Sequence, residues 1–367
     1  MNKRFRVGIV GVSTERRGWG TTAHIPALRA LSDVFETAGV ANTSLASAKA
    51  AAAAFSIPRA FENVAELVAS PDIDVVAVTV KVPHHREVVA AALAAGKHVY
   101  CEWPLGNGLA EAIELAGLAR LSKARAVVGT QATASPEVEL VRKLVADGYV
   151  GEVLSSTYLG SGPTWNDEVT RGDSYVMDSR TGATLLSIIG GHALAAVQSV
   201  LGPVDEVQGV LSQRRKTVRI VETGDTIPMQ TPDHVMVNAV LKSGAPLSLE
   251  LRGGLPRGTQ LLWEINGTLG DLRITAAHDQ FPVINIAPLR VEAGRKGEQG
   301  YREVEAAKSD FVDTVIARNV AAIYRQMARD LVHGTRTAPD FDDAVALHRV
   351  IDAIERSDQT RKRVRID

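Results

Sequence analysis

The first strand and the turn after it constrain the fold of this chain more than any other stretch. Residues 5–10 read Phe-Arg-Val-Gly-Ile-Val and run directly into Gly11. An apolar strand that ends at a glycine is typical of the first βα unit of a dinucleotide-binding domain, where the next helix holds the pyrophosphate with its first amides. We therefore expect Gly8 and Gly11 to form a tight turn that lets a phosphate approach the backbone.

The turn departs from the usual G-x-G-x-x-G spacing, because residues 12–20 are inserted before the predicted helix. Thr21 or Thr22 is expected to cap this helix and to offer a hydroxyl to a phosphate. Arg16 and Arg17 in the insertion would add two cations. Glycine pairs after strands are common, so a turn with no ligand is an alternative on this motif alone.

The rest of the N-terminal third alternates strands with helices. The clearest strand is the apolar, valine-rich run at 74–80, which is typical of a strand buried on both faces. Further strands are predicted at 35–41, 98–101 and 126–129, and helices at 45–55, 63–69, 86–95 and 109–122. This alternation predicts an α/β fold with a doubly wound parallel sheet, a Rossmann domain over residues 1–131.

The pattern changes after residue 131, where strands joined by tight turns dominate. Turn dipeptides such as Ser243-Gly244 and Asn266-Gly267 predict an open, mainly antiparallel sheet with few helices. We expect an α+β domain over 132–340 that binds substrate and mediates oligomerisation, followed by a helix and tail at 341–367. A chain of 367 residues agrees with more than one domain.

Two strands of this sheet alternate apolar and polar residues. Their apolar positions are Val235, Val237, Ala239 and Leu241 in one strand and Leu247, Leu249 and Leu251 in the other. An open sheet that helices cover on one face leaves its second face available to a partner. We expect these residues to leave apolar area for another copy, which predicts a homodimer or homotetramer formed through the C-terminal sheet.

Composition excludes several classes of function. The chain has 41 Lys and Arg against 42 Asp and Glu, which argues against a nucleic-acid-binding surface, and the basic run at 361–365 is expected to be a solvated end. No His or Cys cluster has metal-ligand spacing, so no metal is expected. Cys101 is the only cysteine, so no intramolecular disulfide can form. With no apolar leader and no long apolar stretch, the sequence predicts a cytoplasmic protein that does not contact a membrane.

Three further stretches join the glycine turn in resembling one family. They are Val80-Lys81-Val82-Pro83-His84-His85, Cys101-Glu102-Trp103-Pro104 and Gly190-Gly191-His192. Together they resemble the Gfo/Idh/MocA family of NAD(P)-dependent sugar oxidoreductases, and within it the branch that includes the fungal repressor of galactose genes. The Pro232-Asp233-His234 strand entry and the Gly253-Gly254-x-Pro256 turn carry the likeness to that branch. The resemblance implies an NAD(P) cofactor and a sugar or sugar derivative bound between two domains.

The chain departs from the family at two of the three usual catalytic positions. The family's enzymes usually carry Glu-Lys-Pro, and its lysine contacts the nicotinamide ribose and the substrate hydroxyl; this chain has Trp103 there. Ile188 stands where the family usually has an aspartate one helical turn before the histidine. His192 alone matches, and the resemblance implies that it is the acid/base, a role that suits imidazole. Gly190 and Gly191 are expected to let substrate or nicotinamide approach, and a core histidine is the alternative.

Two more residues complete the predicted catalytic set. The Glu102 carboxylate could hold hydroxyls of the cofactor ribose or of the substrate, or it could form a structural hydrogen bond to the turn. Lys81 follows a buried strand and could replace the charge of the missing lysine, unless it is a solvated side chain. Trp103 offers an apolar plate to a nicotinamide or sugar face, and its peptide bond to Pro104 is a candidate for the cis form.

The predicted cofactor-binding residues lie at strand ends and first turns. They are Gly8, Gly11, Thr21, Thr22, Asn42, Ser44, Val80, Pro83, His84, Glu102, Trp103 and Gln131. Of the two adjacent histidines, we expect His84 to line the cofactor and His85 to pack. No acid follows the second strand, where NAD-selective sites place one on the ribose 2′-hydroxyl. NADP is therefore permitted and NAD is not excluded.

The loop at 160–180 is the predicted substrate-binding segment, because aromatic, acidic and guanidinium groups crowd a stretch with no clear periodicity. Its candidate substrate contacts are Trp165, Arg171, Tyr175 and Arg180, which join His192. An ordinary polar loop is the alternative.

Three functions agree with these residues. The first is an oxidoreductase that transfers a hydride between NAD(P) and a sugar hydroxyl. The second is a redox-neutral glycosidase that oxidises a sugar transiently at C3, eliminates the aglycone and returns the hydride, as some relatives of the family do. The third is a dinucleotide-binding regulator without catalysis, which the two missing catalytic residues favour and the retained His192 does not.

Overall fold

The computed structural model describes residues 4–14, 18–277, 281–307, 312 and 314–366, and it divides into two compact units. The first unit comprises Met1–Gln131 and Ser309–Val345, and the second comprises Ala132–Lys308 and Ala346–Asp367. The sequence predicts 132–340 as one domain, but in the structure the chain returns to the first unit near residue 309. The long amphipathic helix in that segment buries its apolar face against the first helix of the chain.

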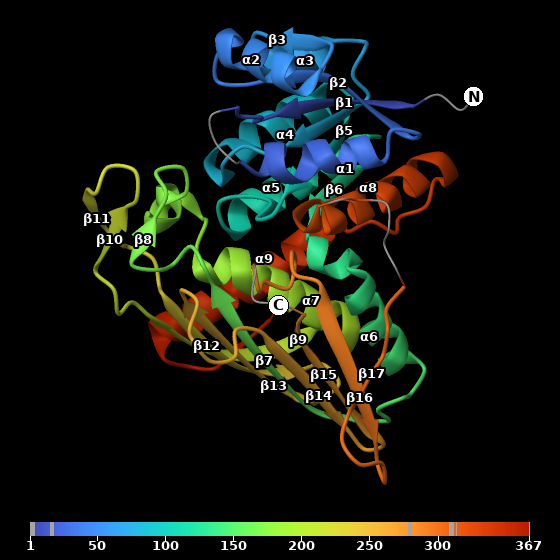
Figure 1. The fold of residues 1–367 in the computed structure, drawn as a ribbon, viewed down its shortest axis with the longest axis vertical. Coiled ribbons are helices and arrows are strands. Elements are labelled where there is room, and N and C mark those ends of the chain that lie inside the picture. The colour runs from blue at the N-terminus through green and yellow to red at the C-terminus, as the bar shows by residue number, and fades with distance from the viewer. Residues whose placement is uncertain (1–3, 15–17, 278–280, 308–311, 313, 367) are drawn as a thin grey trace. The chain divides into compact units, whose positions relative to one another are not determined.

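The first unit is built on a six-stranded parallel sheet of order β3-β2-β1-β4-β5-β6 (Figure 1). Its strands are β1 (Phe5–Val10), β2 (Phe35–Ala41), β3 (Arg59–Phe61), β4 (Val75–Val78), β5 (His98–Glu102) and β6 (Ala126–Gly129). All four residues of β4 are buried, as the apolar run predicts. The strand order reverses between β1 and β4, and in open α/β sheets ligands bind at the carboxyl ends of the strands beside such a switch.

Helices pack on this sheet in two groups. The helices are η1 (Gly20–His24), α1 (Ile25–Ala30), α2 (Leu45–Phe55), α3 (Val64–Ala69), η2 (Val82–His84), α4 (His85–Ala94), α5 (Leu109–Leu121) and α8 (Val315–His333). One group is η1, α1 and α8, and in the other α4 contacts both α3 and α5. After α8 the chain also joins the sheet edge, because the Val128 amide of β6 donates to the Pro339 carbonyl at 2.9 Å.

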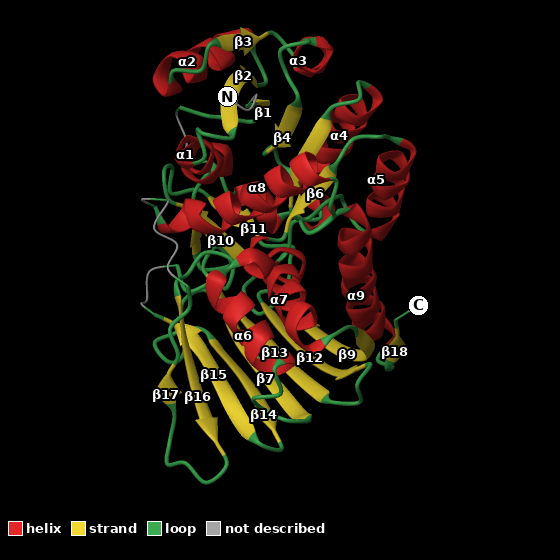
Figure 2. Cartoon of the chain, turned by 90° about the vertical axis from the view of Figure 1, so that its right-hand side faces the viewer, coloured by secondary structure: helices red, strands yellow, loops and turns green. Residues whose placement is uncertain are grey.

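The second unit contains a nine-stranded sheet of order β17-β16-β15-β14-β7-β13-β12-β9-β18 (Figure 2). Its strands are β7 (Val153–Gly162), β9 (Val204–Ser212), β12 (His234–Leu241), β13 (Pro246–Gly253), β14 (Leu262–Gly267), β15 (Gly270–Ala276), β16 (Leu289–Arg295), β17 (Arg302–Glu303) and β18 (Val364–Arg365). Only the pairing of β7 with β13 is parallel among the described strands of this sheet. The predicted open, mainly antiparallel sheet is confirmed.

The remaining elements of the second unit are helices and a small side sheet. The helical elements are η3 (Gln131–Ala134, whose first residue belongs to the first unit), α6 (Pro136–Ala146), η4 (Ser174–Met177), η5 (Ser179–Thr181), η6 (Leu186–Gly190), α7 (Gly191–Leu201) and α9 (Phe341–Thr360). The side sheet joins β8 (Glu168–Val169), β10 (Thr217–Ile220) and β11 (Thr226–Pro228). The unit boundary at 345/346 falls inside α9.

Helices of the second unit cover one face of its large sheet, and α6 and α7 lie on that face in Figure 2. The seven alternating residues of β12 and β13, from Val235 to Leu251, expose 5% of their surface or less. The prediction that they leave apolar area for another copy is wrong, because this protomer's own helices bury them. On the opposite face Val210 and Met236 are register partners, and they expose 47% and 43% of their surface.

One segment, Ser179–Leu201, is long and apolar enough to cross a membrane by length and composition alone. The prediction that no stretch would meet this criterion is therefore wrong. Most of that segment is buried inside the second unit, which is typical of a core helix. It contains η6 and α7, whose apolar side chains pack on the large sheet.

Candidate functional site

Only one of the two predicted turn glycines lies in the turn. Gly8 is inside β1, and a Cβ there would lie 2.8 Å from Leu67 Cδ2 of α3, so its missing side chain makes room for a helix. The prediction that Gly8 forms part of the turn is therefore wrong. Gly11 follows β1 with a φ of +108°, a conformation that favours glycine, and a Cβ there would lie 3.0 Å from the backbone of Thr79.

The turn after β1 is held from the ends of β2 and β4. The Gly11 amide donates to the Ala41 carbonyl at 3.1 Å. Asn42 Oδ1 accepts from the Val12 amide at 2.9 Å, and Asn42 Nδ2 donates to the Val12 carbonyl at 2.6 Å. Thr79 Oγ1 donates to the Val10 carbonyl at 2.9 Å from the other side. The Asn42 amide, a predicted cofactor contact, is thus used to fix the turn.

The first helix begins earlier than the sequence predicts. Trp19 is its N-cap residue, and no side chain caps it. Thr21 Oγ1 donates to the Ser13 carbonyl at 2.7 Å, and Thr22 Oγ1 donates to the Gly18 carbonyl at 3.1 Å. The predicted capping by Thr21 or Thr22 is therefore wrong, because both lie inside the helix and their hydroxyls close the inserted loop. Arg16 and Arg17, the two predicted phosphate cations, lie outside the described residues.

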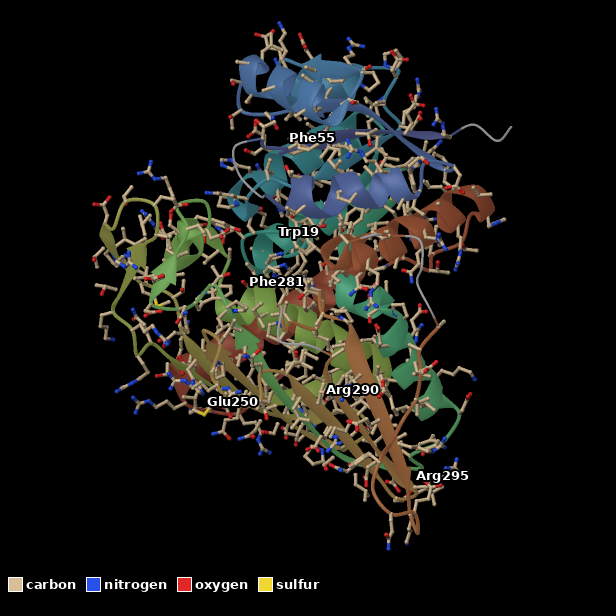
Figure 3. The ribbon with its side chains drawn as sticks, in the orientation of Figure 1. Trp19, Phe55, Glu250, Phe281, Arg290 and Arg295 are labelled. Carbon is tan, nitrogen blue, oxygen red and sulfur yellow. The ribbon has the colours of Figure 1, made fainter. Side chains whose placement is uncertain are left out.

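These residues fit the pyrophosphate of a dinucleotide. The start of this helix carries the positive end of the helix dipole, and the Gly11 turn presents no side chain beside it. The Thr21 and Thr22 amides donate to the Gly18 carbonyl at 3.0 and 2.9 Å. The indole Nε1 of Trp19, labelled in Figure 3, is buried and has no hydrogen-bond partner among the described residues. Ser44 caps α2 by accepting from the Ser47 amide at 3.2 Å, and the first turn of α2 has no acid, so this strand end does not repel a 2′-phosphate.

The segment after β4 divides into exposed and buried side chains. Lys81, Pro83 and His84 are exposed at the carboxyl end of the strand, and Val80 before them is half-buried. His85 is buried, with Nε2 2.9 Å from the Val80 carbonyl and Nδ1 2.9 Å from the Pro104 carbonyl, and burial lowers its pKa. The prediction that His85 packs is confirmed.

A buried cluster of four polar side chains lies at the carboxyl ends of β5 and β6. Glu102 ends β5 and exposes 8% of its surface. Its Oε1 lies 2.7 Å from His24 Nε2, and Gln131 Nε2 lies 2.9 and 2.7 Å from its two oxygens. His24 Nδ1 lies 2.8 Å from the hydroxyl of Tyr324, which comes from α8. The hydrogen bonds described for the Glu102 carboxylate therefore go to side chains within this unit, and not to the turn that the structural alternative named.

The residue after Glu102 is also buried. Trp103 exposes 6% of its surface, and its peptide bond to Pro104 is cis, as the sequence suggests. The indole therefore presents little of its face outside the first unit.

His192 is the second residue of α7 in the second unit and exposes 4% of its surface. Its Nδ1 has no hydrogen-bond partner among the described residues, and burial lowers the pKa of the ring to about 3. The side chain is therefore a neutral imidazole at pH 7. Gly190 serves packing, because a Cβ there would lie 3.1 Å from Leu251 Cδ1 of the sheet and 3.1 Å from Leu186 Cδ1.

The predicted substrate loop is more ordered than its sequence suggests, since it contains β8 and two 3-10 turns. Trp165 exposes 2% of its surface, so it is a core side chain whose Nε1 has no partner among the described residues. Arg180 is exposed and pairs with Asp178 at 2.7 Å, and Arg171 is exposed. Burial raises the pKa of half-buried Tyr175 to about 12. No hydrogen bond or ion pair among the described residues joins these four side chains to His192.

The sequence-based prediction did not include His24 and Tyr324, which complete the cluster around Glu102. A buried histidine three residues after a candidate cap gives no signal of its own in the sequence. Tyr324 lies 300 residues away on a helix that the sequence places in the other domain. The described residues contain no group of three or more His, Cys, Asp or Glu side chains that could hold a metal ion.

Comparison with known proteins agrees with this geometry. Residues 5–130 match the oxidoreductase family with an NAD-binding Rossmann fold, and residues 136–276 match the C-terminal domain of Gal80p. Residues 5–130 are thus similar to the Gfo/Idh/MocA oxidoreductase family, and residues 136–276 are similar to Gal80p. The first unit is accordingly an NAD-binding domain.

Individual relatives of this chain include both enzymes and regulators. A dehydrogenase of Aspergillus oryzae is 28% identical, over 97% of each chain. The structure of the transcriptional regulator Gal80p from Kluyveromyces lactis is 26% identical, with a TM-score of 0.86 over 99% of this chain and 94% of that one. A levoglucosan dehydrogenase in complex with NADH and L-sorbose is 21% identical, with a TM-score of 0.84 over 100% and 99%.

Proposed function

We propose that this chain is an NAD(P)-dependent oxidoreductase that acts on a hydroxyl of a sugar or sugar derivative, with His192 as the acid/base. The observation that carries the proposal is the His192 ring, which is buried, neutral and without a partner at Nδ1 among the described residues, in a chain that has an NAD-binding domain. The dehydrogenase relatives, one of them solved with NADH and L-sorbose, support a sugar as the substrate class.

Oxidation of the sugar hydroxyl to a carbonyl requires one base for the proton and one acceptor for the hydride. The nicotinamide of the oxidised cofactor supplies the hydride acceptor. His192 takes the hydroxyl proton as the carbon–hydrogen bond breaks, and the carbinol becomes a carbonyl. Burial makes His192 a weak base with a pKa of about 3. Such a base suffices when the proton leaves together with the hydride, because a protonated carbonyl is a far stronger acid than imidazolium.

The test is hydride transfer followed by absorbance at 340 nm, with NAD and NADP and a panel of sugars, sugar acids and glycosides. His192→Asn should retain cofactor affinity and lose turnover by roughly a hundredfold to ten-thousandfold, the usual contribution of a general base. His348→Asn is the matched control, because it removes a second buried imidazole from the same unit without touching the proposed acid/base. Equal losses in the two variants would contradict the role of His192.

A second function, a dinucleotide-binding regulator without catalysis, is favoured by one specific observation. Trp103 replaces the family's lysine and is buried, so that position supplies no cation to a substrate. Gal80p, a regulator, is among the relatives. A wild-type protein that binds NAD or NADP in calorimetry and turns over no member of the panel would exclude the oxidoreductase and favour the regulator.

A further inference from the structure

The cluster of Glu102, His24, Gln131 and Tyr324 is packed against aromatic rings. Tyr324 packs on Tyr100 with ring centroids 4.6 Å apart and on Phe35 at 5.3 Å. His24 lies edge-on to Tyr100 at 5.0 Å. A buried polar group in such surroundings is destabilising unless its hydrogen bonds are satisfied. Two atoms here, the Tyr100 hydroxyl and Gln131 Oε1, have no hydrogen-bond partner among the described residues.

One arrangement of protons satisfies the bonds around His24. Burial and the charge of Glu102 raise the pKa of Tyr324 well above its ordinary value, so the phenol keeps its proton at neutral pH. That hydroxyl donates to His24 Nδ1, which leaves the ring hydrogen on Nε2 to donate to Glu102. Gln131 Nε2 donates to the carboxylate from the other side. The order of donation is Tyr324 to His24 to Glu102, with Gln131 as the second donor to Glu102.

This hydrogen-bond chain joins elements that meet at the predicted nucleotide site. His24 lies five residues after Trp19, the N-cap residue of the helix that follows the Gly11 turn. Glu102 directly precedes the Trp103–Pro104 turn. At Gly129 a Cβ would lie 2.9 Å from both Glu102 Oε1 and Gln131 Nε2, so this strand end has room for the pair and for nothing larger.

We propose that His24 and Tyr324 are positioning residues of the NAD site, which hold the first helix against the ends of β5 and β6 through the Glu102 carboxylate. Glu102 then acts within the protein and does not contact sugar or ribose, in contrast to its predicted catalytic role. This inference rests on the proposed function only for the binding of a dinucleotide, and it requires no turnover.

Tyr324→Phe tests the hydroxyl alone, because the phenyl ring keeps the contacts to Tyr100 and Phe35. It removes one hydrogen bond and leaves His24 Nδ1 without a donor, so we expect NADH or NADPH affinity to fall roughly fivefold to tenfold. Phe35→Leu is the matched control, since it loosens packing on the same ring and breaks none of the four bonds. It should lower the melting temperature and leave the dissociation constant within about twofold, a change too small to represent a lost hydrogen bond.

Exchanging the side chains of Glu102 and Gln131 distinguishes an effect on cofactor affinity from an effect on the stability of the fold. Glu102→Gln places two amide groups face to face, and the double variant Glu102→Gln with Gln131→Glu restores one carboxylate and one amide with the carboxylate moved to the end of β6. We expect the double variant to regain most of the melting temperature but not the cofactor affinity, because His24 Nε2 no longer meets a carboxylate.

Three results would overturn the proposal. The first is full recovery of affinity in the double variant, and the second is unchanged affinity in Tyr324→Phe. The third is a wild type that binds neither nucleotide. A nitrogen-detected NMR spectrum of the His24 ring gives an independent check, since the proposal requires the Nε2–H form at neutral pH. Wild-type protein that binds NADH without oxidising any sugar would remove the proposed oxidoreductase activity and leave this inference standing.

Discussion

At the scale of single residues, two buried histidines make the second unit sensitive to acid. Burial lowers the pKa of His192 to about 3 and that of His348 to about 4, against an ordinary value near 6.5. Above that ordinary value both rings are neutral in the folded and unfolded states and contribute no pH dependence. Below it the unfolded chain takes up protons that the folded chain does not, so acid favours unfolding.

We therefore expect the free energy of unfolding to fall by about 1.4 kcal/mol for each pH unit and each such histidine as the pH drops from 6.5 towards their folded pKa values. His192→Asn should flatten this dependence between about pH 6 and pH 4, because asparagine does not titrate in that range. Urea unfolding at several pH values measures it, with His84→Asn at an exposed position as the control. An unchanged slope in His192→Asn would show that the ring is accessible to protons in the folded state.

At the scale of elements, the loop after α8 depends on one carboxylate. Asp330 exposes 1% of its surface and accepts from Thr335 Oγ1 at 2.7 Å, from the Thr337 amide at 2.9 Å and from the Ala338 amide at 2.9 Å. These bonds turn the chain so that the Pro339 carbonyl reaches β6. The loop thereby holds α8, and with it Tyr324, on the first unit.

Asp330→Ala should therefore destabilise the first unit by about 2–4 kcal/mol, because it removes the charged acceptor of the buried Ala338 amide and of the Thr335 and Thr337 donors. Differential scanning calorimetry and urea titration measure the loss. Asp340→Ala is a comparison from the same loop, and it should cost about 1 kcal/mol because Asp340 caps α9 at a more exposed position. A similar loss in both variants would argue against a special role for Asp330.

The same elements show what the sequence can and cannot predict. The strand β4 was predictable because a strand buried on both faces reads as a continuous apolar run, and the glycine turn was predictable because Gly11 requires a positive φ. The apolar stripe of α8 predicts that one face is buried, but it does not say against which partner. The bond from His24 to Glu102 could not be predicted for the same reason, since it depends on where the first helix begins and on Tyr324 of α8, which bonds the other ring nitrogen.

At the scale of the whole molecule, the open face of the large sheet remains our predicted site of self-association, for a different reason from the one the sequence suggests. The buried residues of β12 and β13 do not contribute to it. The exposed pair Val210 and Met236 lies on the open face, beside the Glu250 labelled in Figure 3, which is the register partner of Met236.

We expect sedimentation to give a dimer or a larger species at micromolar protein. Met236→Lys should shift the distribution towards monomer, because it places a charge where an apolar side chain would be buried. Val221→Lys is the matched control, an apolar residue of the same unit that is 51% exposed outside this sheet. A wild type that sediments as a monomer, or equal effects of the two variants, would contradict association through this face.

The return of residues 309–345 to the first unit has a consequence for how this protein can be divided. A fragment ending at Gln131 would keep all six strands of the parallel sheet, yet it would lack Tyr324, the apolar face of α8 and the Pro339 bond to β6. Helix α1 would lose its packing partner, and His24 Nδ1 would lose its donor. The first unit therefore cannot be transferred as one contiguous segment. A gene fusion that contains only its N-terminal part would lack part of the hydrophobic core.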